Sequence, residues 1–148
     1  MADIQSIRNE LNADPLGRGY STMTDQEASN DLNAQTRQQT VPIPVDEVKR
    51  YLFVNDLWFP IKNGTDQVAE AARDAIGMFD AFRVNESDVA TKVDSLLSNL
   101  VSAGYATSSD KAAVQALGVQ MQSRAQELNL LGASPEIGPA HVQQARAL

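Results

Sequence analysis

Few residues of this 148-residue chain could take part in chemistry. The one histidine, His141, could act as a general base, since imidazole titrates near neutral pH. It falls on a short predicted terminal helix near Val142 and Arg146, where a solvent-exposed histidine is the favoured interpretation. The chain has no cysteine, so it holds neither a disulfide nor a thiolate metal site. A single histidine also rules out a multi-histidine metal cluster.

Paired carboxylates and a glycine pair are the remaining candidates. Asp46/Glu47 and Glu86/Asp88 lie near predicted helix starts, where the positive end of the helix dipole accounts for acidic residues without catalysis. Residues 17–19, Gly-Arg-Gly, lack the preceding strand and the Lys-Ser/Thr of a phosphate-binding loop, so they are interpreted as a structural turn. We therefore expect no enzyme, and no catalytic, cofactor-binding or metal-ligating residues.

Charge and hydropathy exclude further classes. The chain has 12 basic and 19 acidic residues, a net charge of −7, and its arginines are dispersed. Affinity for nucleic acid comes mainly from neutralising phosphates, so direct or sequence-specific nucleic-acid binding is not expected. The first residues lack the apolar core of a signal peptide, and no apolar run approaches about 18 residues. We expect no membrane association and a cytoplasmic site of synthesis.

The candidate residues named above are positioned mainly by predicted helices, and the predicted fold class is all-α. Ile4, Ile7 and Leu11 recur at helical spacing, and Thr24 with Glu27 forms a capping box that opens a second helix. An extended linker with two prolines follows, because residues 33–44 show no helical period. The sequence thus predicts an N-terminal helical arm on an extended, Pro-containing linker, followed by a compact multi-helix body.

The expected boundaries are residues 1–43 for arm and linker and 44–148 for the body. Whether the arm packs on its own body or on a neighbouring subunit stays open, since a linker's destination cannot be read from its composition. Apolar spacing and capping residues predict body helices over about 45–54, 66–82, 85–104, 107–118, 123–130 and 140–147. Residues 57–61 are expected to be extended, because a residue before proline disfavours the helical conformation.

Residues 44–61 hold four of the eight aromatic residues, including the only tryptophan. Aromatic side chains bury the most area, so this segment is expected to nucleate the core or an interface. Trp58 and Phe59 could fill the core of the body or anchor another subunit, and the sequence leaves both open. The candidate interface residues are Leu16, Tyr20, Leu32, Tyr51, Phe53, Trp58 and Phe59.

Several stretches together resemble a family of small helical proteins encoded in the virion-structure modules of tailed bacteriophages. They are residues 10–20, 23–28, 31–33, the region of Trp58, 123–130 and 141–146. Asn129 stands where relatives are expected to have glycine, and residues 131–138 form an extended insert. The motifs are structural signatures and cover most of the chain.

The resemblance implies a virion component, most readily at the head–tail neck or connector or in the tail. It implies portal, neck, capsid or tail subunits as partners, a homo-oligomer in the particle, and location in the virion and, during assembly, the host cytoplasm. The alternative is a non-virion helical binding protein, such as an assembly chaperone or a host-takeover factor. Whether the protein is present in mature particles separates the two.

Overall fold

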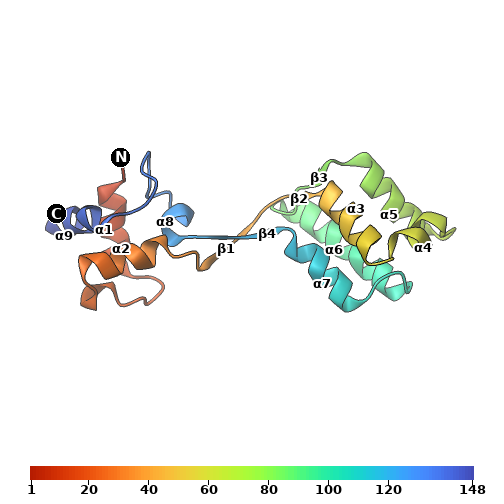
Figure 1. Ribbon diagram of the computed structural model, residues 1–148, viewed down its shortest axis with the longest axis horizontal. Helices are drawn as coiled ribbons and strands as arrows, with labels where there is room; N and C mark the ends of the chain where they lie inside the picture. The colour runs from red at the N-terminus through yellow and green to blue at the C-terminus, as the bar shows by residue number, and fades with distance from the viewer. The chain divides into compact units, whose positions relative to one another are not determined.

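The computed structural model describes all residues from Met1 to Leu148 (Figure 1). The chain is 59% helical and 8% strand, so the fold is helix-rich with small sheets rather than all-α as predicted. The helices are α1 (Ile4–Ala13), α2 (Asp25–Asn33), α3 (Val45–Val54), α4 (Trp58–Asn63), α5 (Gln67–Met78), α6 (Ser87–Ser102), α7 (Ser108–Ala116), α8 (Arg124–Glu127) and α9 (Pro139–Ala147), with a 3₁₀ turn η1 (Tyr20–Thr22). The strands are β1 (Arg37–Thr40), β2 (Ile43–Pro44), β3 (Ala81–Phe82) and β4 (Val119–Gln122).

The chain divides into two compact units. Unit 1 combines Met1–Gln38 with Met121–Leu148, and unit 2 is Gln39–Gln120. This differs from the expected arm and body, because residues 121–148 pack with the first two helices instead of with residues 44–120. The physical reason is that α1 and α2 expose apolar faces too narrow to close a core alone, and α8 and α9 complete it.

Two strands carry the chain between the units. β1 and β4 pair in a two-stranded sheet, and the chain leaves unit 1 through β1 and returns through β4. The segment expected to be an extended linker therefore holds strands β1 and β2. In unit 2, β2 pairs antiparallel with β3, with Ile43 opposite Phe82. These backbone pairings give strand structure to short segments that show no clear strand pattern in the sequence.

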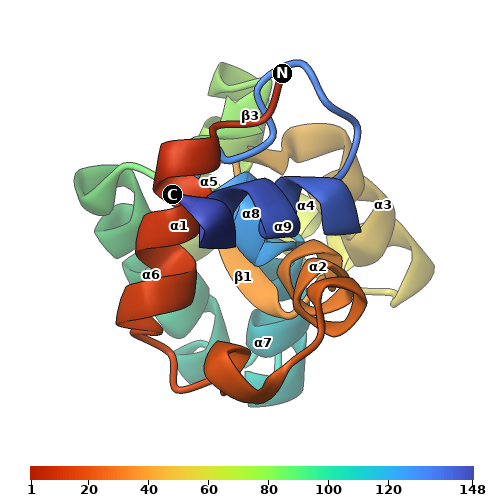
Figure 2. The same cartoon turned by 90° about the vertical axis from the view of Figure 1, so that its left-hand side faces the viewer.

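Unit 1 is built around α9, which packs against both α1 and α2, while α2 also contacts α8 (Figure 2). Local signals fix the ends of these helices. Asp3 caps α1, and the predicted capping box of Thr24 and Glu27 opens α2. The buried apolar side chains of unit 1 are Ala2, Ile7, Leu11, Tyr20, Ala28, Leu32, Ala125, Leu130, Ile137, Val142 and Ala145.

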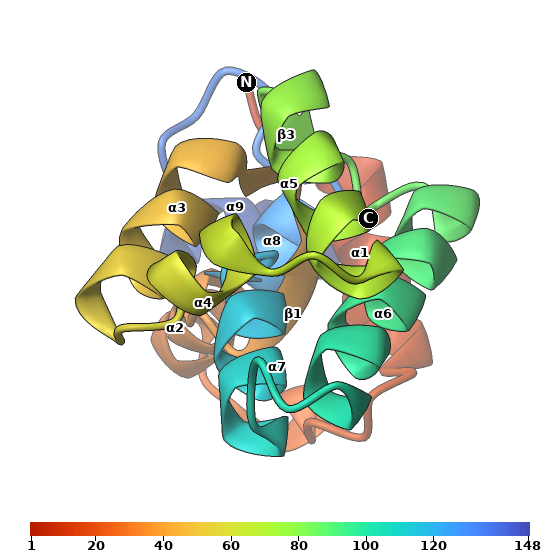
Figure 3. The ribbon, with the colours of Figure 1, turned by 90° about the vertical axis from the view of Figure 1, so that its right-hand side faces the viewer.

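Unit 2 is formed by α3 to α7, with α5 packed against α4 and α6, and α6 against α7 (Figure 3). The predicted helix 45–54 is confirmed residue for residue as α3. Gly104 ends the α6 region with a left-handed φ of 83°, as expected for a glycine stop. The buried core of unit 2 consists of Ile43, Val45, Val48, Leu52, Ile61, Ala72, Ile76, Phe82, Val93, Leu97, Leu100 and Val114.

Two local predictions in unit 2 are wrong. Residues 57–61 are not extended, because Trp58 starts helix α4 and Pro60 occupies its first turn, where no backbone N–H is needed within the helix. Helix α5 ends at Met78 instead of reaching residue 82, because Ala81 and Phe82 pair with β2. Phe79, the residue that follows α5, is half exposed.

Candidate interaction surfaces

Two of the candidate interface residues lie in the core of unit 1. Tyr20 and Leu32 are 1% and 0% exposed, so they stabilise the unit and are not available to another subunit. This corrects the expectation that they contribute to an interface. Their apolar character is evident from the sequence. The sequence does not show that α8 and α9, at the far end of the chain, cover them. Leu16, in the turn between α1 and η1, is partly exposed.

Tyr51 and Trp58 are half-buried and pack against the core of unit 2. The Tyr51 hydroxyl donates a hydrogen bond of 2.7 Å to Oδ1 of Asp110, at the start of α7. This bond raises the pKa of Tyr51, while the backbone N–H of Thr107 and then this hydroxyl lower the pKa of Asp110. The bond therefore ties α3 to the N-terminus of α7. Trp58 acts mainly as a core residue.

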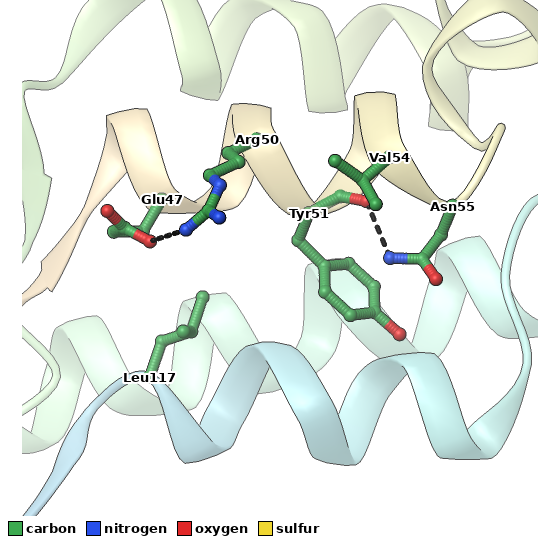
Figure 4. Close-up of a pocket in the computed structure, with 6 residues that line it drawn as sticks. All are labelled: Glu47, Arg50, Tyr51, Val54, Asn55 and Leu117. Carbon is green, nitrogen blue, oxygen red and sulfur yellow. Dashed lines mark hydrogen bonds and ion pairs between the residues drawn. The ribbon is translucent and has the colours of Figure 1, made fainter.

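A shallow pocket lies beside Tyr51, between α3 and α7 (Figure 4). Its volume is about 210 Å³. On α3, Arg50 faces Glu47 at 3.8 Å, and the Asn55 side chain donates to the backbone oxygen of Tyr51. Glu47, Arg50 and Asn55 are thus engaged within α3 and its C-terminal cap, and the Tyr51 hydroxyl is bonded to Asp110 of α7. Leu117 forms the opposite wall. The arrangement is that of a packing seam between two helices.

Phe53 and Phe59 form an exposed apolar surface that we call the aromatic knob. Their exposed fractions are 63% and 54%. The rings of Phe53, at the end of α3, and Phe59, in the first turn of α4, lie 6.5 Å apart between centroids and are inclined by 57°. Burying a phenylalanine side chain stabilises a fold by about 1.5–3 kcal/mol, and unit 2 gains little of this stabilisation from Phe53 and Phe59. Contiguous exposed aromatic area of this kind is typical of interaction sites.

A second apolar surface, the α5–α6 groove, lies elsewhere on unit 2. It has a volume of about 450 Å³. Its lining residues, which are mostly apolar, are Ala75, Phe79, Phe82, Asp88, Val89, Lys92, Val93 and Leu96. The rings of Phe79 and Phe82 lie 5.9 Å apart between centroids, are inclined by 59°, and form part of the lining. Asp88 and Lys92 place one charge of each sign at the exposed rim.

Unit 1 contains a network of ion pairs that no local sequence pattern predicts. Arg124 donates to both carboxylate oxygens of Glu10, at 2.7 and 3.1 Å, and also to Glu127. Glu127 in turn accepts from Arg37 at 2.6 Å, and this bond holds the pKa of Glu127 below its ordinary value. The side chains of Arg124 and Glu10 are only 11% and 5% exposed. The network joins α1, α8 and β1, so it is a structural element of unit 1.

Two further polar groups of unit 1 are the imidazole of His141 and the hydroxyl of Tyr20. Nδ1 of His141 accepts a 3.0 Å hydrogen bond from the N–H of Gly138, so this histidine caps α9. The Tyr20 hydroxyl is buried without a hydrogen-bond partner, and burial raises the pKa of Tyr20. No group of three or more potential ligands is arranged to hold a metal ion.

No helix has the length and apolar character required to cross a membrane. Comparison of the chain with family models, with curated proteins and with solved structures found no match. The aromatic knob and the α5–α6 groove therefore stand as the candidate sites on geometric grounds.

Proposed function

We propose that this protein is a structural component of a tailed-bacteriophage virion, at the head–tail neck or connector or in the tail. It acts by protein–protein assembly, with portal, neck, capsid or tail subunits as partners. The observation that carries the proposal is the aromatic knob. Two adjacent phenylalanines held more than half exposed on a folded unit are an energetic liability for a monomer, and a partner surface removes it.

Three further features support an assembly role. The sequence resemblance to virion-module proteins covers both ends of unit 1 and the Trp58 region. The net charge of −7 suits a component close to packaged DNA, because an acidic surface does not bind the phosphates of a passing genome. Two separately cored units on one chain also allow one protein to contact two neighbours.

Mass spectrometry of purified particles tests the proposal. We expect the protein in mature virions at a fixed ratio to the portal or tail subunits. Absence from mature virions, with presence in immature particles, would instead identify an assembly chaperone. Absence from both would leave a non-virion binding protein.

A variant pair links the result to the knob. Particles assembled with Phe59→Asp should lack the protein, because a carboxylate at the centre of an apolar contact is desolvated without a partner. Particles with Leu148→Asp should retain it, because Leu148 is similarly exposed, at 59%, but lies outside the knob. Normal incorporation of Phe59→Asp would show that the knob does not attach the protein to the particle.

A further inference from the structure

The turn between α4 and α5 contains the only Asn-Gly pair of the chain, at residues 63 and 64 (Figure 1). Nine asparagines occur in the sequence, and only Asn63 is followed by glycine. Asparagine amides are chemically labile, and a following glycine favours their loss because no side chain obstructs its backbone nitrogen. Asn63 is exposed at the last residue of α4, so water reaches its amide. The pair is therefore a candidate for spontaneous deamidation.

Deamidation at this pair requires the backbone nitrogen of Gly64 to attack Cγ of Asn63. The nitrogen loses its proton, the bond from Cγ to Nδ2 breaks, and Nδ2 leaves as ammonia with that proton. One water molecule then opens the resulting succinimide to aspartate or isoaspartate. The five-membered ring does not close while residue 63 keeps the helical ψ, so the C-terminus of α4 must fray before the reaction proceeds.

Arg73, on α5, holds this turn closed. Its Nη1 donates to the carbonyl oxygens of Ile61, Lys62 and Gly64, at 2.7, 3.3 and 2.7 Å. The Gly64 N–H, which must be freed for the reaction, itself donates to the Ile61 oxygen at 3.3 Å. A guanidinium bound to the last carbonyls of a helix satisfies groups that have no partner within the helix. Arg73 thus fastens the C-terminus of α4 and the residue after it to α5.

Packing around Gly64 leaves no room for a longer backbone. A Cβ atom built on this glycine would collide with the Tyr105 hydroxyl and with the side chain of Ala69. Tyr105 is held in place by a hydrogen bond of 2.9 Å to Asp66, which also caps α5. Isoaspartate puts one additional carbon into the backbone before Gly64, so its formation displaces the glycine. The modified turn therefore does not regain its original contacts.

We infer that Asn63 is a deamidation site whose rate is set by Arg73. In the closed turn Asn63 is helical and the Gly64 N–H is engaged, so only molecules with an open turn react. When opening and closing are fast relative to the chemical step, the observed rate follows the population of the open form. A molecule that forms isoaspartate then keeps the turn open. This modification is independent of the proposed assembly role.

Peptide mapping by mass spectrometry of the full-length protein, incubated at mildly alkaline pH, tests this site. Deamidation at Asn63 should be slow in the native wild type and fastest in the wild type dissolved in urea. Native Arg73→Ala should react at least about tenfold faster than the native wild type, because charged hydrogen bonds to the Ile61 and Gly64 carbonyls are lost. Arg50→Ala, which removes an exposed arginine of the same unit, should react at the wild-type rate.

Trp58 fluorescence verifies that each native variant keeps unit 2 folded. If Arg73→Ala unfolds, Arg73→Lys takes its place: the single ammonium group keeps the charge but does not bind all three carbonyls, so this variant should still react faster than the wild type. A native wild type that reacts as fast as the urea sample would overturn the inference. So would a folded Arg73 variant that reacts at the wild-type rate, or an Asn63 that stays unmodified in urea.

Discussion

Replacing Arg124 by alanine should unfold unit 1 while leaving unit 2 intact. The substitution removes two hydrogen bonds from the carboxylate of Glu10, which is 5% exposed, and one from Glu127. Glu127 keeps its bond to Arg37, but Glu10 loses its only guanidinium partner. Breaking a buried ion pair by removing one member costs about 3–5 kcal/mol, because it leaves an uncompensated buried charge.

That cost is as large as the stability a unit of this size can supply. A single core of fewer than about 70–80 residues rarely provides more than about 3–5 kcal/mol. We therefore expect unit 1 of Arg124→Ala to be largely unfolded at 25 °C. Replacing both Glu10 and Arg124 by methionine should restore most of the loss, since an apolar pair of similar length leaves no buried charge unpaired.

The only tryptophan makes the two units separable by spectroscopy. Trp58 packs in unit 2, so its fluorescence during urea titration reports that unit, whereas far-UV circular dichroism reports the helices of both. Arg124→Ala should reduce the initial helical signal and leave the midpoint of the Trp58 transition unchanged. Arg50→Ala, which breaks an exposed pair with Glu47, should change neither. Full helicity of Arg124→Ala, with a loss of less than about 1 kcal/mol, would refute the reasoning.

Three other predictions concern the same two units. Trp58→Ala should destabilise unit 2 by about 2 kcal/mol. This is below the range of about 3–5 kcal/mol for a fully buried tryptophan, because the Trp58 side chain is half-buried. Thermal unfolding followed by circular dichroism measures this loss of stability. A fragment of residues 39–120 should fold alone, since it has its own core; dispersed amide signals in a nuclear magnetic resonance spectrum would show this, and a random-coil spectrum would contradict it. The bond from Arg37 lowers the folded pKa of Glu127, so it stabilises the fold above the unfolded pKa of about 4.3. This stabilisation is lost as pH falls through the folded pKa. In urea titrations, Glu127→Gln should therefore reduce the dependence of the free energy of unfolding on acidic pH.

The starts of most helices could be predicted from the sequence. The capping box at Thr24 and the helix 45–54 are both present in the structure. Asn129, where the resemblance expects glycine, adopts a left-handed φ of 56°, a conformation that asparagine tolerates. These features were predictable because the interacting groups lie within four or five residues of one another, so local spacing is enough to identify them.

The grouping of the helices was decided only by tertiary structure. The expected body of residues 44–148 did not anticipate that α9 packs on α1 and α2, or that β1 pairs with β4. The pair of Glu10 and Arg124 spans 114 positions, and no spacing rule connects two such residues. The sequence determined which side chains are apolar and where helices begin. It did not determine which faces meet, because an apolar stripe or an extended strand can pair with any complementary partner, and only the free energy of the whole fold selects among them.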